Sequence, residues 1–302
     1  MRVSMLASCS CPASVGKLHG NTTRRPLPSA KLSSSRNSKN PIHVVFATEN
    51  SNGDSAPSTV HLVGAGPGGL DNLTVKALRV LQNADVVVHD DLGGGEADIL
   101  NECKPECELI HVGKRGGDQK SWKQNDVNDL LIKLAKRGKT TVRLKGGCPS
   151  VFSRVREEMD SLKKESIPYE LVAGISSSLA APLSANVPLT EKNFGKHFAV
   201  TSAHDVLSLN FSAYEHIDTC VFLMAGKALP VIVERLIEES GKGITTPCIV
   251  VKWGCTEREE VFFGTLETII ETTSGKKLSP CVFVAGEVCA EVVGENTGST
   301  EG

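Results

Sequence analysis

Residues Val60–Gly69 read VHLVGAGPGG, a short apolar run that ends in a glycine-rich loop. The run has the length of a β-strand. The segment Leu73–Leu81 has apolar residues at three- and four-residue spacing, which predicts a helix. Glycines let a backbone turn tightly and approach a ligand closely. A strand, a glycine loop and a helix in this order indicate an α/β protein that binds a small molecule at the end of a parallel strand.

The alternation of strands and helices continues and predicts two α/β domains. The first, at residues 58–165, is expected to have a largely parallel sheet, because its strands are apolar at their centres and alternate with helices. The second is expected at residues 168–292, after a boundary marked by charge and a proline. Residues 293–302 are polar and glycine-rich, which predicts a disordered tail.

Each of these elements is expected from a short apolar pattern. In the first domain, strands after Val60–Val63 are expected at 84–88, 109–112 and 140–144, with a helix over 127–135. In the second, strands are expected at 169–172, 197–201, 219–224, 247–251 and 280–284, with helices around 178–181 and 232–237.

Residues 1–50 differ in composition from the rest of the chain. They are rich in serine, contain seven Lys or Arg and one acidic residue, Glu49, and lack the apolar run of a secretory signal. This composition is typical of an organelle transit peptide. Ser and Thr dominate without an Arg-rich amphipathic helix, so we expect import into the chloroplast stroma. The alternative is a disordered tail with no targeting role.

Charge and cysteine usage exclude several classes of protein. The chain carries a net charge of -2, and without residues 1–50 the net charge becomes -8. A protein with this negative charge has no general attraction for nucleic acid or anionic lipid. No stretch of the sequence approaches the roughly 18 consecutive apolar residues of a membrane-spanning helix. Cys103 and Cys107 lie close in sequence, but no second close pair completes a zinc site, so we expect free thiols and no metal.

The first glycine loop also fits another class, the dinucleotide-dependent oxidoreductases. Residues Gly64–Gly69 satisfy G-x-G-x-x-G, and Asp90 lies 21 residues further on, near the spacing of a ribose-binding acid. However, Pro67 lacks the backbone N–H that such a loop donates to phosphate, and Leu70–Asn72 separate the loop from the helix. A purely structural turn is the remaining alternative. A second loop at Arg143–Arg154, RLKGGCPSVFSR, favours a ligand held between strand ends.

Motifs along most of the chain resemble the tetrapyrrole methylase family and follow its order. They are Val63–Gly68 (the opening loop), Asn72–Leu78 (the first helix), Gly113–Arg115 (GKR), Arg143–Pro149 (RLKGGDP), Gly174–Ala181 (PGITSA), Val187–Thr190 (IPLT), Phe222–Pro230 (YMG…LP) and Gly254–Thr256 (RGT). The resemblance covers about residues 59–290. It points to a divergent member close to the plant uroporphyrinogen-III C-methyltransferases, because of the run RLKGG-P-VF-R.

The resemblance implies a two-domain tetrapyrrole methylase fold with its cofactor, S-adenosyl-L-methionine, in the interdomain cleft, and a homodimeric enzyme. The implied reaction is C-methylation of uroporphyrinogen III to precorrin-2, a step of sirohaem and porphyrin biosynthesis. The residues at cofactor-contact positions are Pro67, Gly146, Gly147, Cys148, Val151, Ser176, Ser177, Met224 and Gly254.

The resemblance also assigns the catalytic and substrate-binding residues. Asp90 becomes the proton acceptor and Lys114 the proton donor. Arg115 and Arg154 become candidates for binding the carboxylates of the tetrapyrrole, since arginine suits bidentate contact with a carboxylate. Each has a local alternative: a turn or cap acid for Asp90, a solvated pair for Lys114 and Arg115, and a structural ion pair for Arg154.

Several positions depart from the family pattern. Cys148 replaces an acid, Val155-Arg156 replaces two glycines, and Asp91 replaces an arginine. Replacing an acid with Cys148 removes a charged acceptor, whose hydrogen bond contributes roughly 1.5–3 kcal/mol. A non-catalytic paralogue, or one with another substrate, is therefore the main alternative to an active methyltransferase, ahead of the oxidoreductase.

Overall fold

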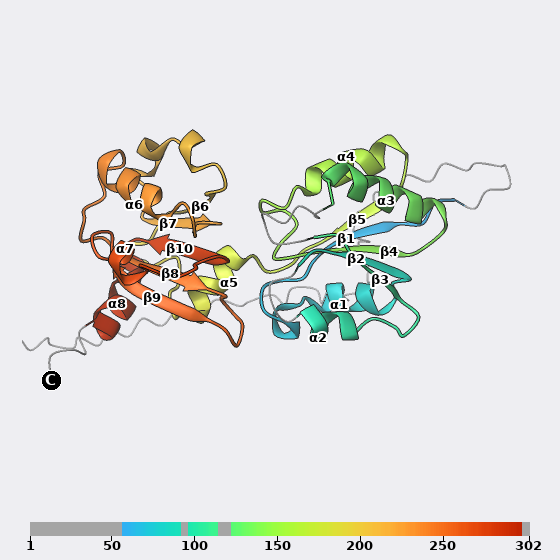
Figure 1. Cartoon of the computed structure of the whole chain (residues 1–302), viewed down its shortest axis with the longest axis horizontal. Coiled ribbons are helices and arrows are strands. Elements are labelled where there is room, and N and C mark those ends of the chain that lie inside the picture. The colour runs from blue at the N-terminus through green and yellow to red at the C-terminus, as the bar shows by residue number, and fades with distance from the viewer. Residues whose placement is uncertain (1–55, 92–95, 114–121, 298–302) are drawn as a thin grey trace, which may run out of the picture. The chain divides into compact units, whose positions relative to one another are not determined.

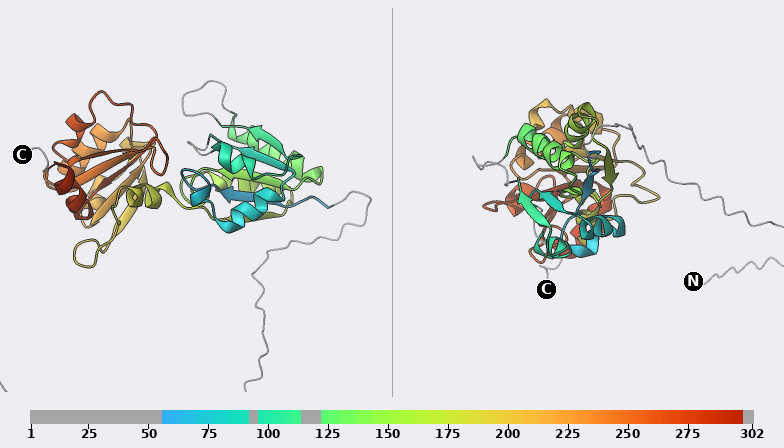
Figure 2. Two further views of the ribbon diagram at one scale, coloured as in Figure 1. Left: turned by 90° about the horizontal axis from the view of Figure 1, so that it is seen from below. Right: turned by 90° about the vertical axis from the view of Figure 1, so that its right-hand side faces the viewer.

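The computed structural model describes residues 56–91, 96–113 and 122–297. By contact, the chain divides into residues 1–44 and residues 45–302, and all described helices and strands belong to the second unit. These elements form two five-stranded sheets, each with helices on both faces (Figures 1 and 2). Within the described ranges, no helix is long and apolar enough to cross a bilayer.

The first sheet is entirely parallel, with strand order β3-β2-β4-β1-β5. Its strands are β1 (Val60–Gly64), β2 (Val86–His89), β3 (Glu108–His111), β4 (Thr141–Lys145) and β5 (Tyr169–Val172). The prediction of a largely parallel sheet is confirmed. The prediction that residues 169–172 open the second domain is wrong, because β5 pairs with β1 in the first sheet.

Helices cover both faces of this sheet (Figure 1). The helices α1 (Val75–Gln82) and α2 (Glu96–Asn101) lie on one face, and α3 (Gln124–Lys136) and α4 (Val155–Lys164) lie on the other. Val142 and Leu144 of β4 pack in the cluster that contains Ala77 and Leu81 of α1. Because side chains alternate along a strand, the intervening Arg143 faces the α3 and α4 side.

The second sheet is mixed, with strand order β6-β7-β10-β8-β9. Its strands are β6 (Phe198–Ser202), β7 (Thr219–Leu223), β8 (Pro247–Lys252), β9 (Glu260–Thr265) and β10 (Cys281–Ala285). Only β6 and β7 pair in parallel, and the three other pairs are antiparallel. The sequence patterns predicted every strand of this sheet except β9.

The second sheet is also packed on both faces. The helices α5 (Ser177–Ser184) and α8 (Ala290–Thr297) pack on one face, while α6 (Leu229–Glu238) and α7 (Ile269–Thr272) pack on the other, around Phe222 and Phe283. Short 3-10 turns complete the fold: η1 (Leu70–Asn72), η2 (Val206–Ser208), η3 (Phe211–Tyr214) and η4 (Glu287–Cys289). Because α8 continues to Thr297, the predicted disordered tail is wrong for residues 293–297.

Candidate active site

The two glycine loops predicted from the sequence are joined by backbone hydrogen bonds. Gly66 N–H donates to the Gly147 carbonyl at 3.1 Å, and Gly147 N–H donates to the Gly66 carbonyl at 3.2 Å. The loops meet because β1 and β4 are neighbouring parallel strands, whose carboxyl ends lie at the same edge of the sheet. Together they form one surface at that edge.

Some glycines of this region are required for backbone packing and others face open space. A Cβ at Gly174 would lie 2.2 Å from the Gly147 carbonyl oxygen, and a Cβ at Gly64 would lie 2.5 Å from the same atom. A Cβ at Gly146, by contrast, would meet no heavy atom within 4 Å. The space for a ligand is therefore at Gly146 and the adjoining Gly147.

The first loop does not lead directly into a helix. The turn η1 intervenes, and α1 begins at Val75 behind Thr74, whose Oγ1 accepts from Ala77 N–H at 3.2 Å. A Cβ at Gly68 would lie 2.1 Å from the carbonyl oxygen of Cys255, so protein backbone occupies that side of the loop. A dinucleotide loop instead presents a helix N-terminus to the pyrophosphate. The geometry therefore argues against the oxidoreductase alternative.

The start of α5 adjoins the second glycine loop. A Cβ at Gly147 would lie 3.9 Å from the Ser177 backbone nitrogen. Ser176 is the N-cap of α5, is 7% exposed, and accepts from Ser178 N–H at 3.3 Å through its Oγ. The structure thus brings the start of α5, at Ser176 and Ser177, to Gly147 of the second loop.

Cys148 completes the second loop with a thiol in a polar environment. Its Sγ lies 3.0 Å from Ser150 Oγ. Partial burial by itself raises the pKa of the Cys148 thiol, but hydrogen bonds from the Ser150 side chain and from the backbone of Ser150 and Gly174 outweigh it and lower the pKa. Cys148 is therefore a polar, ionisable group beside the open glycine surface.

The other predicted cofactor positions are Pro67 in the first loop, Val151 in the second loop, and Met224 and Gly254 after strands β7 and β8. The Pro67 carbonyl accepts from Asn72 Nδ2 at 2.9 Å, and Val151 packs against the α5 and α8 face of the second sheet. Met224 directly follows β7 and is 47% exposed. Gly254 follows β8, and a Cβ there would lie 2.5 Å from the Cβ of Ala181. Packing against α5 is thus sufficient to explain glycine at 254.

Asp90 lies immediately after β2, and its carboxylate is bound by a buried arginine. The Nη2 of Arg143 donates to Oδ1 at 2.6 Å and to Oδ2 at 2.7 Å. The Asp90 side chain is 34% exposed and that of Arg143 is 3% exposed. This arginine is on a neighbouring strand, which distinguishes Asp90 from a helix-capping acid.

Arg143 belongs to a buried charge network that the sequence analysis did not identify. Glu158 of α4 is 0% exposed, and its Oε1 accepts from Arg143 Nε at 3.1 Å and from Lys145 Nζ at 2.7 Å. Burial and the nearby Arg143 lower the pKa of Lys145, although Glu158 raises it. Arg143 and Lys145 lie on a strand with apolar neighbours. This pattern could have indicated the network from the sequence, because buried charges need partners.

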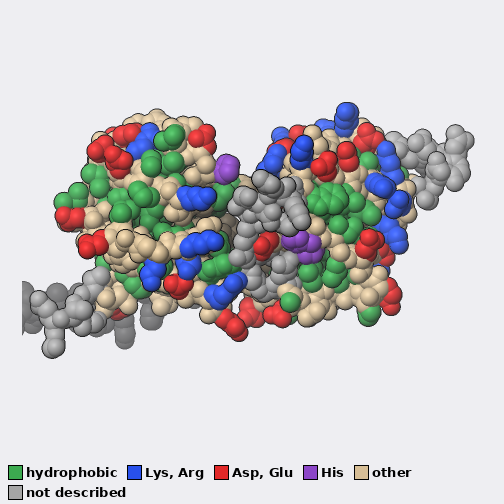
Figure 3. Space-filling model, in the orientation of Figure 1, with side chains coloured by type: hydrophobic (Ala, Val, Ile, Leu, Met, Phe, Trp, Pro, Cys, Tyr) green, Lys and Arg blue, Asp and Glu red, His purple; other side chains and the backbone are tan. Residues whose placement is uncertain are grey.

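Of the remaining predicted residues, only Arg154 lies within the described residues. Arg154 is exposed and pairs with Glu157 of its own helix, at 2.7 Å from Nε to Oε1. Lys114 and Arg115 lie outside the described residues. Acidic and basic side chains are interspersed on the face shown in Figure 3.

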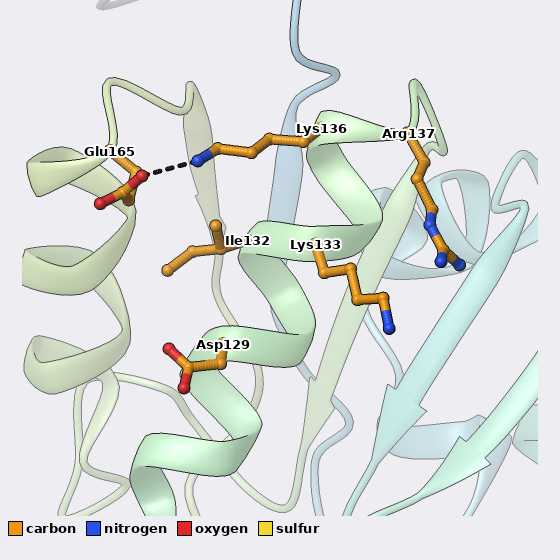
Figure 4. Close-up of a pocket in the computed structure, with 6 residues that line it drawn as sticks. All are labelled: Asp129, Ile132, Lys133, Lys136, Arg137 and Glu165. Carbon is orange, nitrogen blue, oxygen red and sulfur yellow. Dashed lines mark hydrogen bonds and ion pairs between the residues drawn. The ribbon is translucent and has the colours of Figure 1, made fainter.

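A depression beside α3 is lined mainly by charged side chains (Figure 4). Lys136 points toward Glu165 at the end of α4 and pairs with it at 2.6 Å, while Lys133 and Arg137 extend on the other side of the helix. The pair is largely exposed, so it contributes little to stability. We assign this depression no function.

Cysteine, histidine and acidic side chains are the usual protein ligands of metal ions. The eight cysteines in the described ranges are free thiols. Among these same residues, no group of three or more His, Cys, Asp or Glu is placed to hold a metal ion. The site thus consists of the glycine surface, Cys148 and the network around Asp90.

Glycine loops at the carboxyl ends of parallel strands, next to a carboxylate held by a buried arginine, define an α/β protein that binds a small ligand at a sheet edge. Residues 59–270 match the family described as Tetrapyrrole (Corrin/Porphyrin) Methylases, and the chain belongs to this family. This confirms the resemblance found in the sequence motifs.

Individual relatives support the same family. The uroporphyrinogen-III C-methyltransferase of Methanocaldococcus jannaschii is 40% identical over 234 residues, which are 76% of this chain and 96% of that protein. The siroheme synthase of Pseudomonas fluorescens is 36% identical over 77% of this chain but only 50% of its own length. The structure of the Thermus thermophilus uroporphyrin-III C-methyltransferase in complex with S-adenosyl homocysteine is similar with a TM-score of 0.66 and 31% identity. That similarity covers 78% of this chain and all of the solved one.

Proposed function

We propose that this protein transfers methyl groups from S-adenosyl-L-methionine to carbon atoms of uroporphyrinogen III and forms precorrin-2 for sirohaem biosynthesis. The observation that carries the proposal is the 40% identity to an archaeal uroporphyrinogen-III C-methyltransferase over 96% of that protein's length. The relation of the glycine surface to Asp90 supports it, because a ligand surface and a carboxylate base follow neighbouring strands, β4 and β2.

The reaction needs the methyl donor and the carbon nucleophile to be aligned, and it needs one proton to be removed. S-adenosyl-L-methionine supplies an activated methyl group, and a reduced pyrrole is an electron-rich carbon nucleophile. Gly146 and Gly147 leave room for a ligand against the backbone, and Ser176 and Ser177 add polar groups beside it. Asp90 accepts the proton that the methylated carbon releases, and the protein holds the reactants within attack distance.

The departures from the family pattern are compatible with this proposal. Cys148 retains a hydrogen-bonding side chain, and hydrogen bonds from Ser150 and Gly174 lower its pKa. Val155 and Arg156 lie in the first turn of α4, where Arg156 is exposed and Val155 packs against the core. Neither residue blocks Gly146, whose Cβ position is open.

The direct test is methyl transfer by the full chain under anaerobic conditions. Uroporphyrinogen III and methyl-labelled S-adenosylmethionine should yield labelled tetrapyrrole, identified by mass spectrometry. Asp90→Asn should lower turnover at least about 100-fold and leave the affinity for S-adenosylhomocysteine unchanged. Asp129→Asn, on the outer side of α3, is the matched control. No label from the wild-type chain beside an active relative would favour a non-catalytic paralogue.

Lys114, Arg115 and Arg154 complete the proposed site. Lys114 donates a proton, and the two arginines bind carboxylates of the substrate, for which a planar guanidinium is suited. Arg154 must leave Glu157 to do so, an exposed pairing that costs little to break. Arg154→Lys should raise KM for uroporphyrinogen III more than it changes kcat, which steady-state kinetics can measure.

Residues 1–50 are proposed to direct the protein into the chloroplast stroma and to be removed there. The serine-rich, acid-poor composition supports this. Isolated chloroplasts incubated with the labelled full chain should protect a shortened product from external protease. A chain that stays full-length and protease-sensitive would identify residues 1–50 as a tail without targeting function.

We also propose that the protein acts as a homodimer without nucleic-acid partners. Exposed apolar side chains on α5, Leu179 at 47% and Leu183 at 65%, are consistent with a surface covered by another copy. Light scattering coupled to gel filtration should give a mass twice that of the 32.1 kDa chain. A monomer at micromolar concentration would contradict the proposal.

A further inference from the structure

Arg143 is bonded in several directions at once. Its Nε donates to Glu158, and its Nη2 donates to both oxygens of Asp90. Its Nη1 donates to the carbonyl oxygens of Val88 at 3.4 Å and of Leu144 at 3.2 Å. All three guanidinium nitrogens are therefore engaged. A planar group bonded on all sides keeps one orientation, and so does the carboxylate that it binds.

Glu158 is the other anion of this network and lies deepest in the protein. Its side chain is 0% exposed, and its Oε1 accepts from Arg143, from Lys145 and, at 3.3 Å, from Gln124. Burying a carboxylate is costly unless cations and hydrogen bonds surround it. An apolar residue would fill the position under α4 without that cost, so packing alone does not account for glutamate here.

The network joins the interior under α4 to the end of β2. Asp90 follows the last residue of β2 and is partly exposed, so its side chain could adopt several rotamers without a partner. The two bonds from Nη2 fix both of its oxygens, and Glu158 accepts from Nε of the same guanidinium. A proton acceptor needs this kind of support, because small displacements of a reacting group lower the rate strongly.

We propose that Glu158 is a positioning residue that acts through Arg143 to hold the Asp90 carboxylate in place for proton transfer. The inference rests on the proposed function, which gives Asp90 its role. Glu158 does not itself touch substrate or cofactor. Its effect on catalysis therefore passes through Asp90, and it disappears when Asp90 is replaced.

A double-mutant cycle on turnover tests this dependence. Glu158→Gln keeps the shape and removes the charge, and kcat should fall by up to about 100-fold with the affinity for S-adenosylhomocysteine unchanged. In an Asp90→Asn background the same substitution should lower the residual rate no further. Asp160→Asn is the matched control, because it makes the same chemical change on the exposed side of α4. Wild-type kcat in Glu158→Gln, or a full additional loss in the Asp90→Asn background, overturns the inference.

Arg143→Lys provides a second variant that retains the positive charge. Lysine has one nitrogen and cannot hold Glu158 and both oxygens of Asp90 together. We expect it to lower kcat about as much as Glu158→Gln, and again to add nothing once Asp90 is asparagine. A variant with wild-type kcat would show that the bridge is unnecessary and would overturn the inference.

A second double-mutant cycle, measured on the unfolding equilibrium, does not depend on the substrate. Because Asp90 and Glu158 share Arg143, urea denaturation should show that their substitutions are coupled at least about threefold in the unfolding equilibrium constant. Coupling here without methyl transfer by the wild-type chain would mean that the proposed function fails while the hold on Asp90 stands. Additive effects on unfolding would overturn the inference whatever the substrate.

Discussion

Gly174→Ala tests the packing of the three backbones that meet at the candidate site. The new Cβ would lie 2.2 Å from the Gly147 carbonyl oxygen and 2.8 Å from the Cα of Gly64, whereas ordinary contact begins at 3.4 Å. The obstructing atoms are backbone atoms next to strands β1 and β4, so no side chain can rotate away. One segment must therefore shift by about 1 Å in an interior that is already closely packed.

Overpacking of this kind costs typically 1–3 kcal/mol, and the rigid backbone here places the expected loss near the upper limit, at about 3 kcal/mol. For a protein of this size that loss lowers Tm by about 6–12 °C. Urea denaturation followed by circular dichroism measures the free energy of unfolding, and an unchanged m-value would show that the unfolded state is the same.

Gly146→Ala is the matched control for this prediction. Its Cβ meets no heavy atom within 4 Å, so the free energy of unfolding should stay within about 0.5 kcal/mol of wild type. Its affinity for S-adenosylhomocysteine should nevertheless fall, because the methyl group occupies the surface proposed for the ligand. If Gly174→Ala were as stable as wild type, the close approach of the three backbones would be refuted.

Three further predictions concern the core, the first sheet and the ligand loop. Phe222→Ala should lower the free energy of unfolding by about 3–5 kcal/mol, because it empties the centre of an aromatic cluster; urea denaturation measures the loss. Hydrogen bonding to Lys104 lowers the pKa of Asp85. The interaction between the two side chains therefore stabilises the fold above about pH 4, and this stabilisation is lost as pH falls through the pKa of Asp85 in the folded protein. The Tm difference between wild type and Asp85→Asn should therefore shrink in acid. Cys148 should react with iodoacetamide faster than the buried thiols, Ser150→Ala should slow it, and S-adenosylhomocysteine should protect it; mass spectrometry of peptides reads all three rates.

Strands with fully buried apolar centres were predictable from the sequence, and the edge strand β9 was not predicted. The strands β2, β7 and β10 consist of buried residues, and β1 has one half-buried residue, His61; such runs are recognisable without any partner. β9, Glu260–Thr265, is an edge strand whose short apolar run, Val261–Phe263, is only half-buried. Its place depends on antiparallel pairing with β8, a contact that local patterns do not encode.

The assignment of β5 failed for a related reason. Its place along the chain, between β4 and β6, does not decide its sheet; hydrogen bonding with β1, far back in the chain, does. In the same way, the sequence motifs brought Gly146 and Asp90 into one site but not Glu158. The glycine loop has a local pattern, whereas the role of Glu158 follows from the alternation of β4 side chains toward α4.

The position of β1 in its sheet affects how the protein is made. β1 is the first described strand of the chain, yet its neighbours β4 and β5 are made later, and its His61 pairs with Glu170, 109 residues further on. Until β5 emerges from the ribosome, apolar residues such as Leu62 have no permanent cover. Contacts so distant in sequence form slowly and leave nascent chains prone to aggregation, which chaperones counteract. The strand that carries the first glycine loop is thus synthesised early and paired late.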